Sequence, residues 1–187
     1  MERCGWAKSP KEIEYHDHHW CRVCHDDQQI FEMLILEGLQ AGLSWSLILE
    51  RWEGLKEALD QFDYTKIAHY DDNKKQALLL HQAMIKNKLK INAIVSNAKC
   101  FMAVQEEFGS FDKYIWQFVD NQPIVHHYSS LSEVPAYNEL SEKISKDLKK
   151  RGFKFVGKTI IYSFMQAIGM VNDHLITCPY HKECNNL

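Results

Sequence analysis

The sequence predicts an all-α protein, and three observations lead to that prediction. Eight glycines and four prolines among 187 residues provide too few turns for an all-β chain. Alternation of apolar and polar residues is weak throughout, whereas apolar residues at helical spacing recur along the chain. Only the segment from Ile124 to Leu131, which lies between Pro123 and Pro135, looks extended.

The expected helices follow in order from this spacing and from the residues that flank them. They lie in two parts of residues 28–50, at 72 to about 84, at 90–108, around 140–148, and at 159 to about 169. A bend at 42–44 separates the first two helices. Asp72 and Asn73 can cap the next one, and Gly109 and Gly152 lie just past two helix ends, where a C-terminal glycine belongs.

Length and charge limit the class of protein. A chain of 187 residues is expected to form a single domain, 1–187, that buries its core without disulfides. The net charge of −3 excludes a globally basic histone-like binder but not a local basic patch. The longest apolar run, Cys100–Val104, is too short for a membrane span, and residues 1–20 contain no signal peptide. We therefore expect a cytoplasmic protein whose cysteines are thiols or metal ligands.

Residues that bind metals gather at both ends of the chain: Cys4, His16, His18, His19, Cys21, Cys24 and His25, then His174, Cys178, His181 and Cys184. The spacing of His174 and Cys178 predicts one face of a helical turn, and Cys21-x-x-Cys24 is the other paired candidate. Spacing alone does not choose between the set Cys4, His16, His174 and Cys178 and a set built on Cys21 and Cys24. Four such ligands would form a closed zinc site that ties the termini together. The alternatives are scattered thiols and imidazoles, or a redox Cys-x-x-Cys pair.

Residues 149–158 form a basic segment without an acidic residue, containing Lys149, Lys150, Arg151, Lys154 and Lys158. Gly157 is expected to open the next helix, whose free N–H groups and positive dipole end suit a phosphate oxygen. A hairpin of this kind would hold a DNA phosphate whatever the base sequence. The alternative is a solvated run of charge at a helix C-terminus. A second, weaker basic cluster consists of Lys86, Lys88 and Lys90.

Glu37 falls on an apolar helix face, together with Ile30, Met33, Leu34 and Ala41. Burying a carboxylate there without partners costs several kcal/mol, of order 2–7 for a lone polar group. Aromatic residues are dense nearby in the sequence: Trp6, Tyr15, Trp20 and Trp45. An aromatic cleft with one acceptor could hold a purine and read its exocyclic amine. The alternatives for Glu37 are a core carboxylate with internal partners and a helix face that opens locally to solvent. The alternative for the aromatic residues is an ordinary core.

Four separated motifs together resemble the bacterial 3-methyladenine DNA glycosylase I family. They are MERCGWA at the start, YHDHHW at 15–20, LEGLQAGLSW at 36–45, and RGFKFVGKTIIYSFMQAIGMVNDH at 151–174. The resemblance covers essentially the whole chain. It implies an all-α helix-hairpin-helix DNA glycosylase fold, with that motif at about 141–169 and a structural zinc that ties the N- and C-terminal segments.

The resemblance also implies a role for individual residues. One Zn²⁺ would be held by Cys4, His16, His174 and Cys178, and the base would be read by Glu37 between Trp6, Tyr15, Trp20 and Trp45. Gly42 and Leu43 correspond to a tip that fills the gap left by a flipped base, and Lys154, Gly157 and Lys158 lie in the DNA-binding hairpin. The chain departs from the family pattern at Phe155, where many related glycosylases have a glycine. Asp173 is not assigned as a catalytic aspartate, because the family lacks that residue.

The activity implied is monofunctional hydrolysis of the N-glycosidic bond of 3-methyladenine in alkylated double-stranded DNA, by a monomer in the bacterial cytoplasm. The flipped base would enter the aromatic pocket, and Glu37 would accept from its exocyclic amine and favour the cationic base. The alternative function is a non-catalytic, zinc-stabilised binder of damaged DNA.

Overall fold

Polar side chains at the start of the longer helices bind the free N–H groups of the first turn. The computed structural model describes residues 2–184. In five helices, the side chain of the capping residue accepts a hydrogen bond from the backbone N–H three residues further on; these residues are Asp26, Ser44, Asp71, Asn87 and Asn138. These caps explain where the helices begin. Met1 and residues 185–187, the outer ends of the predicted unit 1–187, lie outside the described residues.

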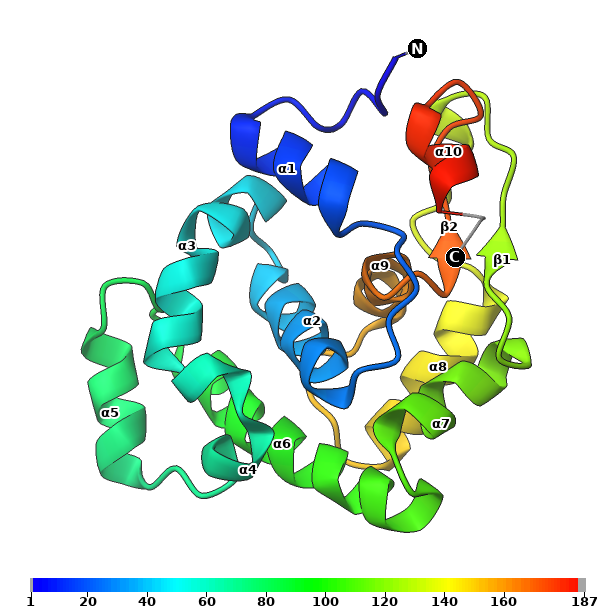
Figure 1. Ribbon diagram of the computed structural model, residues 1–187. Coiled ribbons are helices and arrows are strands. Elements are labelled where there is room, and N and C mark those ends of the chain that lie inside the picture. Colours follow the sequence, from blue (N-terminus) through cyan, green and yellow to red (C-terminus); the bar gives the residue numbers. More distant parts are fainter. Residues whose placement is uncertain (1, 185–187) are drawn as a thin grey trace.

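Helices make up most of the described chain (Figure 1). They are α1 (Pro10–His18), α2 (Asp27–Gln40), α3 (Trp45–Ala58), α4 (Tyr64–Ile67), α5 (Asp72–Leu80), α6 (Lys88–Phe108), α7 (Phe111–Trp116), α8 (Glu139–Lys150), α9 (Lys158–Ala167) and α10 (Pro179–Glu183). Short 3₁₀ turns lie at Asp60–Phe62, Gln117–Val119 and Leu131–Glu133, and the strands are β1 (Ile124–Val125) and β2 (Val171–Asn172). Within residues 2–184, no helix is long and apolar enough to cross a membrane.

Helix α2 lies at the centre of the molecule, and α3, α6, α7 and α9 pack around it (Figure 1). Its residues from Ile30 to Leu39 are all buried, so this helix is covered on every side. The buried stretch includes two carboxyl groups. Glu32 is bound by Trp52 and Lys56, whereas Glu37 faces the cavity described below. Helices α8 and α9 also pack against each other, and the basic segment 149–158 runs from the end of α8 to the start of α9.

The two ends of the described chain meet on one side of the molecule. Figure 1 shows the blue N-terminal segment beside the orange and red segment that contains β2 and α10. Cys21 donates its N–H to the Gln166 carbonyl, and Arg22 forms an ion pair with Glu183 at 2.7 Å. The strands β1 and β2 run parallel in this region, with Ile124 opposite Val171.

The prediction of a mainly helical protein is confirmed, with differences in detail. The bend at 42–44 separates α2 from α3, where Gly42 has a φ of 75°. The predicted cap at Asp72 and Asn73 is wrong by one residue, because Asp71 accepts the N–H of Lys74. That helix also ends at Leu80 rather than Met84, since His81 has extended backbone angles.

The expected extended segment 124–131 is also shorter than predicted. Only Ile124 and Val125 form a strand, and Leu131 begins a 3₁₀ turn. The strand exists because β2 supplies its hydrogen-bonding partner from a distant part of the chain. Ile124 donates to the Met170 carbonyl, and His126 donates to the Asn172 carbonyl. A local sequence pattern does not reveal such a partner.

Candidate functional site

A cavity of about 360 Å³ lies where α1, α2, α3 and α9 approach one another. It is lined by Trp6, Tyr15, Trp20, Glu37, Gln40, Trp45, Leu131, Val134, Ser163 and Gln166. The structure therefore brings together all five residues that the sequence placed in a candidate base pocket. They come from the segment before α1, from α1, from the turn after it, and from α2 and α3.

The aromatic rings of the cavity meet edge to face. The centroids of Trp6 and Trp20 are 5.0 Å apart, and those of Tyr15 and Trp45 are 5.1 Å apart. Three buried polar groups of the cavity have no hydrogen-bond partner among the described residues: Trp6 Nε1, Tyr15 OH and Trp45 Nε1. Buried donors are normally satisfied, so these three groups are available to a molecule that enters the cavity.

Glu37 is the acidic group of this cavity. Its side chain is enclosed, with 4% of the residue exposed, and burial alone raises its pKa to about 8. The carboxyl group is therefore mostly neutral at pH 7 in the free protein. Burial, and next the charge of Glu37, raise the pKa of the Tyr15 hydroxyl well above its usual range. The cavity can thus offer neutral donors and one carboxyl whose charge depends on what it binds.

Several residues that line the cavity were not predicted from the sequence. Gln40 lies three residues after Glu37 on α2, and Gln166 lies three residues after Ser163 on α9. Such spacing places each pair on one helix face, so it could have identified Gln40 once Glu37 was chosen. Leu131 and Val134 enter from an irregular segment that carries no comparable signal.

A buried cluster of two thiols and two imidazoles lies beside the aromatic cavity. The ligand atoms of Cys4, His16, His174 and Cys178 all lie within 4.8 Å of one another. Cys178 Sγ is 3.7 Å from His16 Nε2 and from His174 Nδ1, and Cys4 Sγ is 3.8 Å from the same His174 nitrogen. The set built on Cys21 and Cys24 is not assembled, because the Cys21 thiol instead accepts the N–H of Asp173.

Neighbouring groups orient these four side chains. His16 Nδ1 is hydrogen-bonded to Asp17 at 2.8 Å, which turns Nε2 toward the cluster. His174 Nε2 lies 3.3 Å from the Trp20 carbonyl, and burial lowers the pKa of this imidazole. Hydrogen bonding with Cys4, and then with the two imidazoles, lowers the pKa of the Cys178 thiol. Thiolate and neutral imidazole are the protonation states that ligate a metal ion.

The predicted helical turn at His174 and Cys178 is wrong, although the two side chains do meet. Residues 174–178 form a non-helical turn, closed by a hydrogen bond from the Cys178 N–H to the Leu175 carbonyl. Helix α10 begins only at Pro179, because proline is favoured in a first helical turn. The turn also lets the Leu175 N–H donate to Cys4 Sγ.

The connection between α8 and α9, residues 151–157, is held in place by buried polar contacts. The Asn97 side chain bonds both the carbonyl and the N–H of Lys154, at 3.0 and 2.8 Å. Phe155 has a φ of 55°, a left-handed conformation that is unusual for a phenylalanine. Gly157 caps α9 with an ordinary φ of −63°, and a Cβ added there would meet no atom within 4 Å. The fold itself therefore does not require a glycine at this position.

Folding neutralises part of the basic segment. Arg151 forms ion pairs with Glu107 and Asp147, at 2.6 and 2.8 Å. The Lys158 ammonium lies 3.6 Å from Glu142 and over the ring of Tyr137. Lys149, Lys150 and Lys154 are exposed and form no ion pair among the described residues. The positive charge available at the surface is smaller than the sequence indicates.

Lys90 does not belong to a surface cluster with Lys86 and Lys88, and that prediction is wrong. It is buried, and its ammonium donates to the carbonyls of Leu39 and Ala41 at 2.7 and 2.6 Å. These carbonyls lie at the C-terminal end of α2, which favours a cation. Lys90 thus holds the end of the helix that carries Glu37.

The tip formed by Gly42 and Leu43 is joined to the cavity through Gln40. The Gln40 amide donates to the Leu43 carbonyl at 2.8 Å, and the Leu43 N–H donates to the Gln40 carbonyl. Gly42 adopts a φ of 75°, a value that favours glycine, and its residue is exposed. The tip is therefore exposed at Gly42 and is held to Gln40, a residue that lines the cavity.

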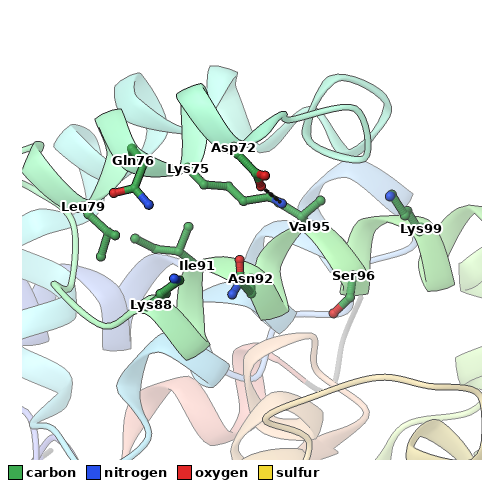
Figure 2. A pocket seen from close by; sticks show the side chains of 10 residues that line it. All are labelled: Asp72, Lys75, Gln76, Leu79, Lys88, Ile91, Asn92, Val95, Ser96 and Lys99. Carbon is green, nitrogen blue, oxygen red and sulfur yellow. Dashed lines mark hydrogen bonds and ion pairs between the residues drawn. The ribbon is translucent and has the colours of Figure 1, made fainter.

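A larger cavity, of about 530 Å³, lies between α5 and α6 (Figure 2). Figure 2 shows lysine and amide side chains around an apolar floor that includes Leu79 and Ile91, with Lys75 paired to Asp72. Among the residues singled out from the sequence, the cavity contains Lys88 of the weaker basic cluster and Asp72, but none of those predicted to bind the base or a metal. Size alone does not make it the functional site, because it lacks the buried carboxyl and free donors of the aromatic cavity.

The fold and this site define a helical protein with a buried Cys and His cluster and an aromatic cavity built around a carboxyl group. Residues 6–182 match the model of the methyladenine glycosylase family, and the chain belongs to that family. It is an enzyme of the glycosylase class, as expected from the sequence.

Individual relatives agree with this assignment. DNA-3-methyladenine glycosylase 1 of Escherichia coli (strain K12) is 44% identical over 179 residues, which cover 95% of this chain and 96% of the relative. A crystal structure of 3-methyladenine DNA glycosylase I has a TM-score of 0.92 at 43% identity and covers 95% of this chain and 98% of that one. A variant of such an enzyme, solved in complex with 3-methyladenine, also has a TM-score of 0.92, at 33% identity, covering 96% and 97%.

Proposed function

We propose that this protein hydrolyses the N-glycosidic bond of 3-methyladenine in alkylated double-stranded DNA. The observation that carries the proposal is the cavity in which Glu37 lies without a partner among aromatic rings and three free donors. The complex of a related enzyme with 3-methyladenine supports the same ligand. A flat purine fits such a site, because its faces can stack and its edges can form hydrogen bonds.

Glu37 favours the alkylated base through charge. Methylation at N3 makes the attached adenine cationic, and a cation next to the carboxyl lowers its pKa and stabilises the ionised form. The carboxylate then accepts a charge-assisted hydrogen bond from the exocyclic amine. Stacking of the cation on the indole and phenol rings adds about 0.5–2 kcal/mol. An unmodified adenine carries no such charge and gains less.

The chemistry requires little from the protein beyond binding the flipped base and admitting water. The cationic base is already a good leaving group, so water can attack the sugar carbon as the N-glycosidic bond breaks. The products are the free base and an abasic site. No lysine lines the cavity among the described residues, which supports monofunctional hydrolysis without a Schiff base.

We assign the DNA contacts to the tip and to the α8–α9 connection. In a helix-hairpin-helix at about 141–169, the free N–H groups at the start of α9 would bind a phosphate. The open space beside Gly157 allows the DNA backbone to approach, and Lys154 and Lys158 add charge. Gly42 and Leu43 would fill the gap that the flipped base leaves in the duplex.

The Cys and His cluster fits one structural zinc ion. Tetrahedral zinc with bonds of 2.0–2.3 Å has neighbouring ligand atoms about 3.6 Å apart, and the sulfur–nitrogen distances here are 3.7–3.8 Å. All four positions would be filled by protein atoms, leaving none for a water molecule. The zinc would supply folding free energy, and it would have no part in the hydrolysis.

We further propose that the chain acts as a single domain, 1–187, and as a monomer in the bacterial cytoplasm. The packing of α2 against helices from both halves of the chain supports one shared core. Release of free 3-methyladenine from methylated duplex DNA tests the function. Release by the wild-type protein at a rate far above spontaneous loss supports it. Tight binding of methylated DNA without release would instead favour the non-catalytic binder considered from the sequence.

A further inference from the structure

Gln166 brings a second hydrogen-bonding group to the cavity that holds Glu37. It lies on α9 and lines the cavity with its side chain partly exposed. Its amide nitrogen Nε2 donates to Asp173 Oδ2 at 2.7 Å. The amide is therefore bound at one end to the protein, while the residue still borders the space where a ligand would lie.

Asp173 is fully buried and accepts hydrogen bonds on both of its oxygens. Tyr162 OH donates to Oδ2 at 2.8 Å, beside the Gln166 amide, and Oδ1 lies 2.6 Å from His126 Nδ1. The backbone N–H of Asp173 donates to Cys21 Sγ. These contacts fix the carboxylate, so it is a rigid acceptor against which the Gln166 amide must align.

This partner determines which way the Gln166 amide points. Rotating the amide by half a turn would place its oxygen against a carboxylate oxygen, and neither atom could donate. A glutamine without such a partner can turn either end to a ligand. Gln166 keeps Nε2 on Asp173, which leaves Oε1 as the amide atom free to accept from a bound molecule.

We propose that Gln166 is a specificity-determining residue, whose amide oxygen, oriented by Asp173, selects a 6-amino purine over a 6-oxo purine. This proposal rests on the proposed function, since it concerns the base held by Glu37. A 6-amino group has two N–H bonds, so it can satisfy both the Glu37 carboxylate and the Gln166 oxygen. Once Glu37 is ionised, a 6-oxo group would face two acceptors, and a site left with unpaired buried polar groups binds weakly. Asp173 acts as a positioning residue that does not touch the base.

The test uses two free bases that differ at this position, 3-methyladenine and 3-methylhypoxanthine. At pH 9, where Glu37 is ionised, quenching of the cavity tryptophans gives the dissociation constant of each base for the wild type and for Gln166→Leu, which has a similar length but no amide. We expect the variant to bind 3-methyladenine roughly five- to twentyfold more weakly, as for one lost hydrogen bond, and the oxo base equally well or better. Equal changes for both bases, or no change for either, would overturn the proposal.

Two further variants separate orientation from general damage. Gln105→Leu is the matched control, because the Gln105 amide also donates to a carboxylate, that of Asp27, at 2.6 Å and outside the cavity. It should keep the wild-type ratio of the two constants. Asp173→Asn, verified as folded by its melting curve, can donate to Gln166 Oε1 and should reduce the ratio. A folded Asp173→Asn protein with the wild-type ratio would remove Asp173 from the proposal.

The wild type distinguishes this proposal from the proposed function. If wild-type protein neither binds 3-methyladenine nor releases it from methylated DNA, the proposed function fails. If it does both and Gln166→Leu leaves the preference between the two bases intact, only the inference about Gln166 fails.

Discussion

Helix α2 carries two buried carboxyl groups, Glu32 and Glu37, that differ in their hydrogen-bonding partners. Glu32 is buried but bound by Trp52 and Lys56. Glu37 has no described partner, and burial raises its pKa to about 8. A group held in this way destabilises the fold once it ionises, so its presence is explained better by a ligand than by packing.

The first prediction concerns stability and pH at Glu37. Its folded pKa of about 8 exceeds its ordinary value of 4.5, so the folded state binds more protons between these values. Wild-type stability should therefore fall as pH rises from 5 to 8, and Glu37→Gln should remove that decline. Between pH 5 and 8, the free energy of unfolding of the variant should rise by on the order of a few kcal/mol relative to that of the wild type. Urea unfolding at several pH values measures the difference.

An exposed acid on α3 provides the control for that experiment. Glu57→Gln removes a carboxylate that has no described ion pair, so its stability relative to wild type should stay level between pH 5 and 8. If the stability difference for Glu37→Gln is equally level, Glu37 has an ordinary pKa and the cavity is more solvated than the structure indicates.

The second prediction concerns excision by the same variant. Glu37→Gln keeps the shape of the side chain but cannot become negative beside a cationic base. Losing a charge-assisted hydrogen bond of about 1.5–3 kcal/mol should slow 3-methyladenine release by about one to two orders of magnitude. In the wild type, kcat/KM should rise with pH up to about 8, where the free carboxyl ionises, and the variant should lack that rise.

Affinity for DNA that already contains an abasic site is the companion measurement. No base occupies the cavity in that complex, so Glu37→Gln should bind abasic DNA as the wild type does. If Glu37→Gln releases 3-methyladenine at the wild-type single-turnover rate, Glu37 is a structural carboxyl group and the base-binding site lies elsewhere.

At the scale of elements, the α8–α9 connection combines an exposed lysine with a glycine that the fold does not need. Lys154 is free of ion pairs, whereas Arg151 and Lys158 have acidic neighbours. Asn97 fixes the backbone on both sides of the Lys154 peptide. A rigid backbone and a free charge shortly before a helix start are what a phosphate site requires.

The third prediction follows from this connection. Lys154→Ala and Gly157→Val should both weaken DNA binding. For each variant, the loss of affinity should be the same for methylated and for undamaged DNA, since phosphate contacts carry no information about the base. For Lys154→Ala, the slope of log affinity against log salt should fall by about one unit. Gly157→Val should still fold, because its side chain would point into open space. Fluorescence anisotropy over a range of salt concentrations measures both effects.

The matched control is Lys146→Ala on α8, which removes an exposed lysine that pairs with Glu142. It should change the salt dependence much less than Lys154→Ala. A loss of affinity that is confined to methylated DNA would move this connection into the base pocket and contradict the phosphate assignment.

Among the elements, those with a local signal could be predicted from the sequence. The apolar period of α6 and the glycine after it gave a helix that matches the structure to within two residues at its start. Helix α1 was not predicted from the sequence, and neither were α4, α7 and α10, which have four to six residues and are too short to show a helical period. The left-handed conformation of Phe155 could not be predicted either, since a phenylalanine rarely adopts it.

At the scale of the whole molecule, the candidate site is assembled from segments that are far apart in the sequence. Glu37 could be identified because a carboxyl group interrupts an apolar helix face. Gln166 could not, because a polar residue on a helix is ordinary until its neighbour Asp173 is known. The choice of Cys4 and His16 over Cys21 and Cys24 depended on the family resemblance, and the structure places only the first pair with His174 and Cys178.

The fourth prediction concerns the metal and the two ends of the chain. Cys4 and His16 lie near the N-terminus and His174 and Cys178 near the other end, so one ion would add a strong link between segments that already meet through backbone hydrogen bonds and the Arg22–Glu183 ion pair. The purified protein should contain one zinc per chain, and Cys178→Ser should lower both the metal content and the melting temperature. Chelation of the wild type should expose the same two segments to hydrogen exchange before the core around α2. The double variant Cys21→Ser with Cys24→Ser is the control and should retain the zinc, because neither thiol belongs to the cluster. Loss of the metal from that double variant, with retention in Cys178→Ser, would show that the ligand set is the other one.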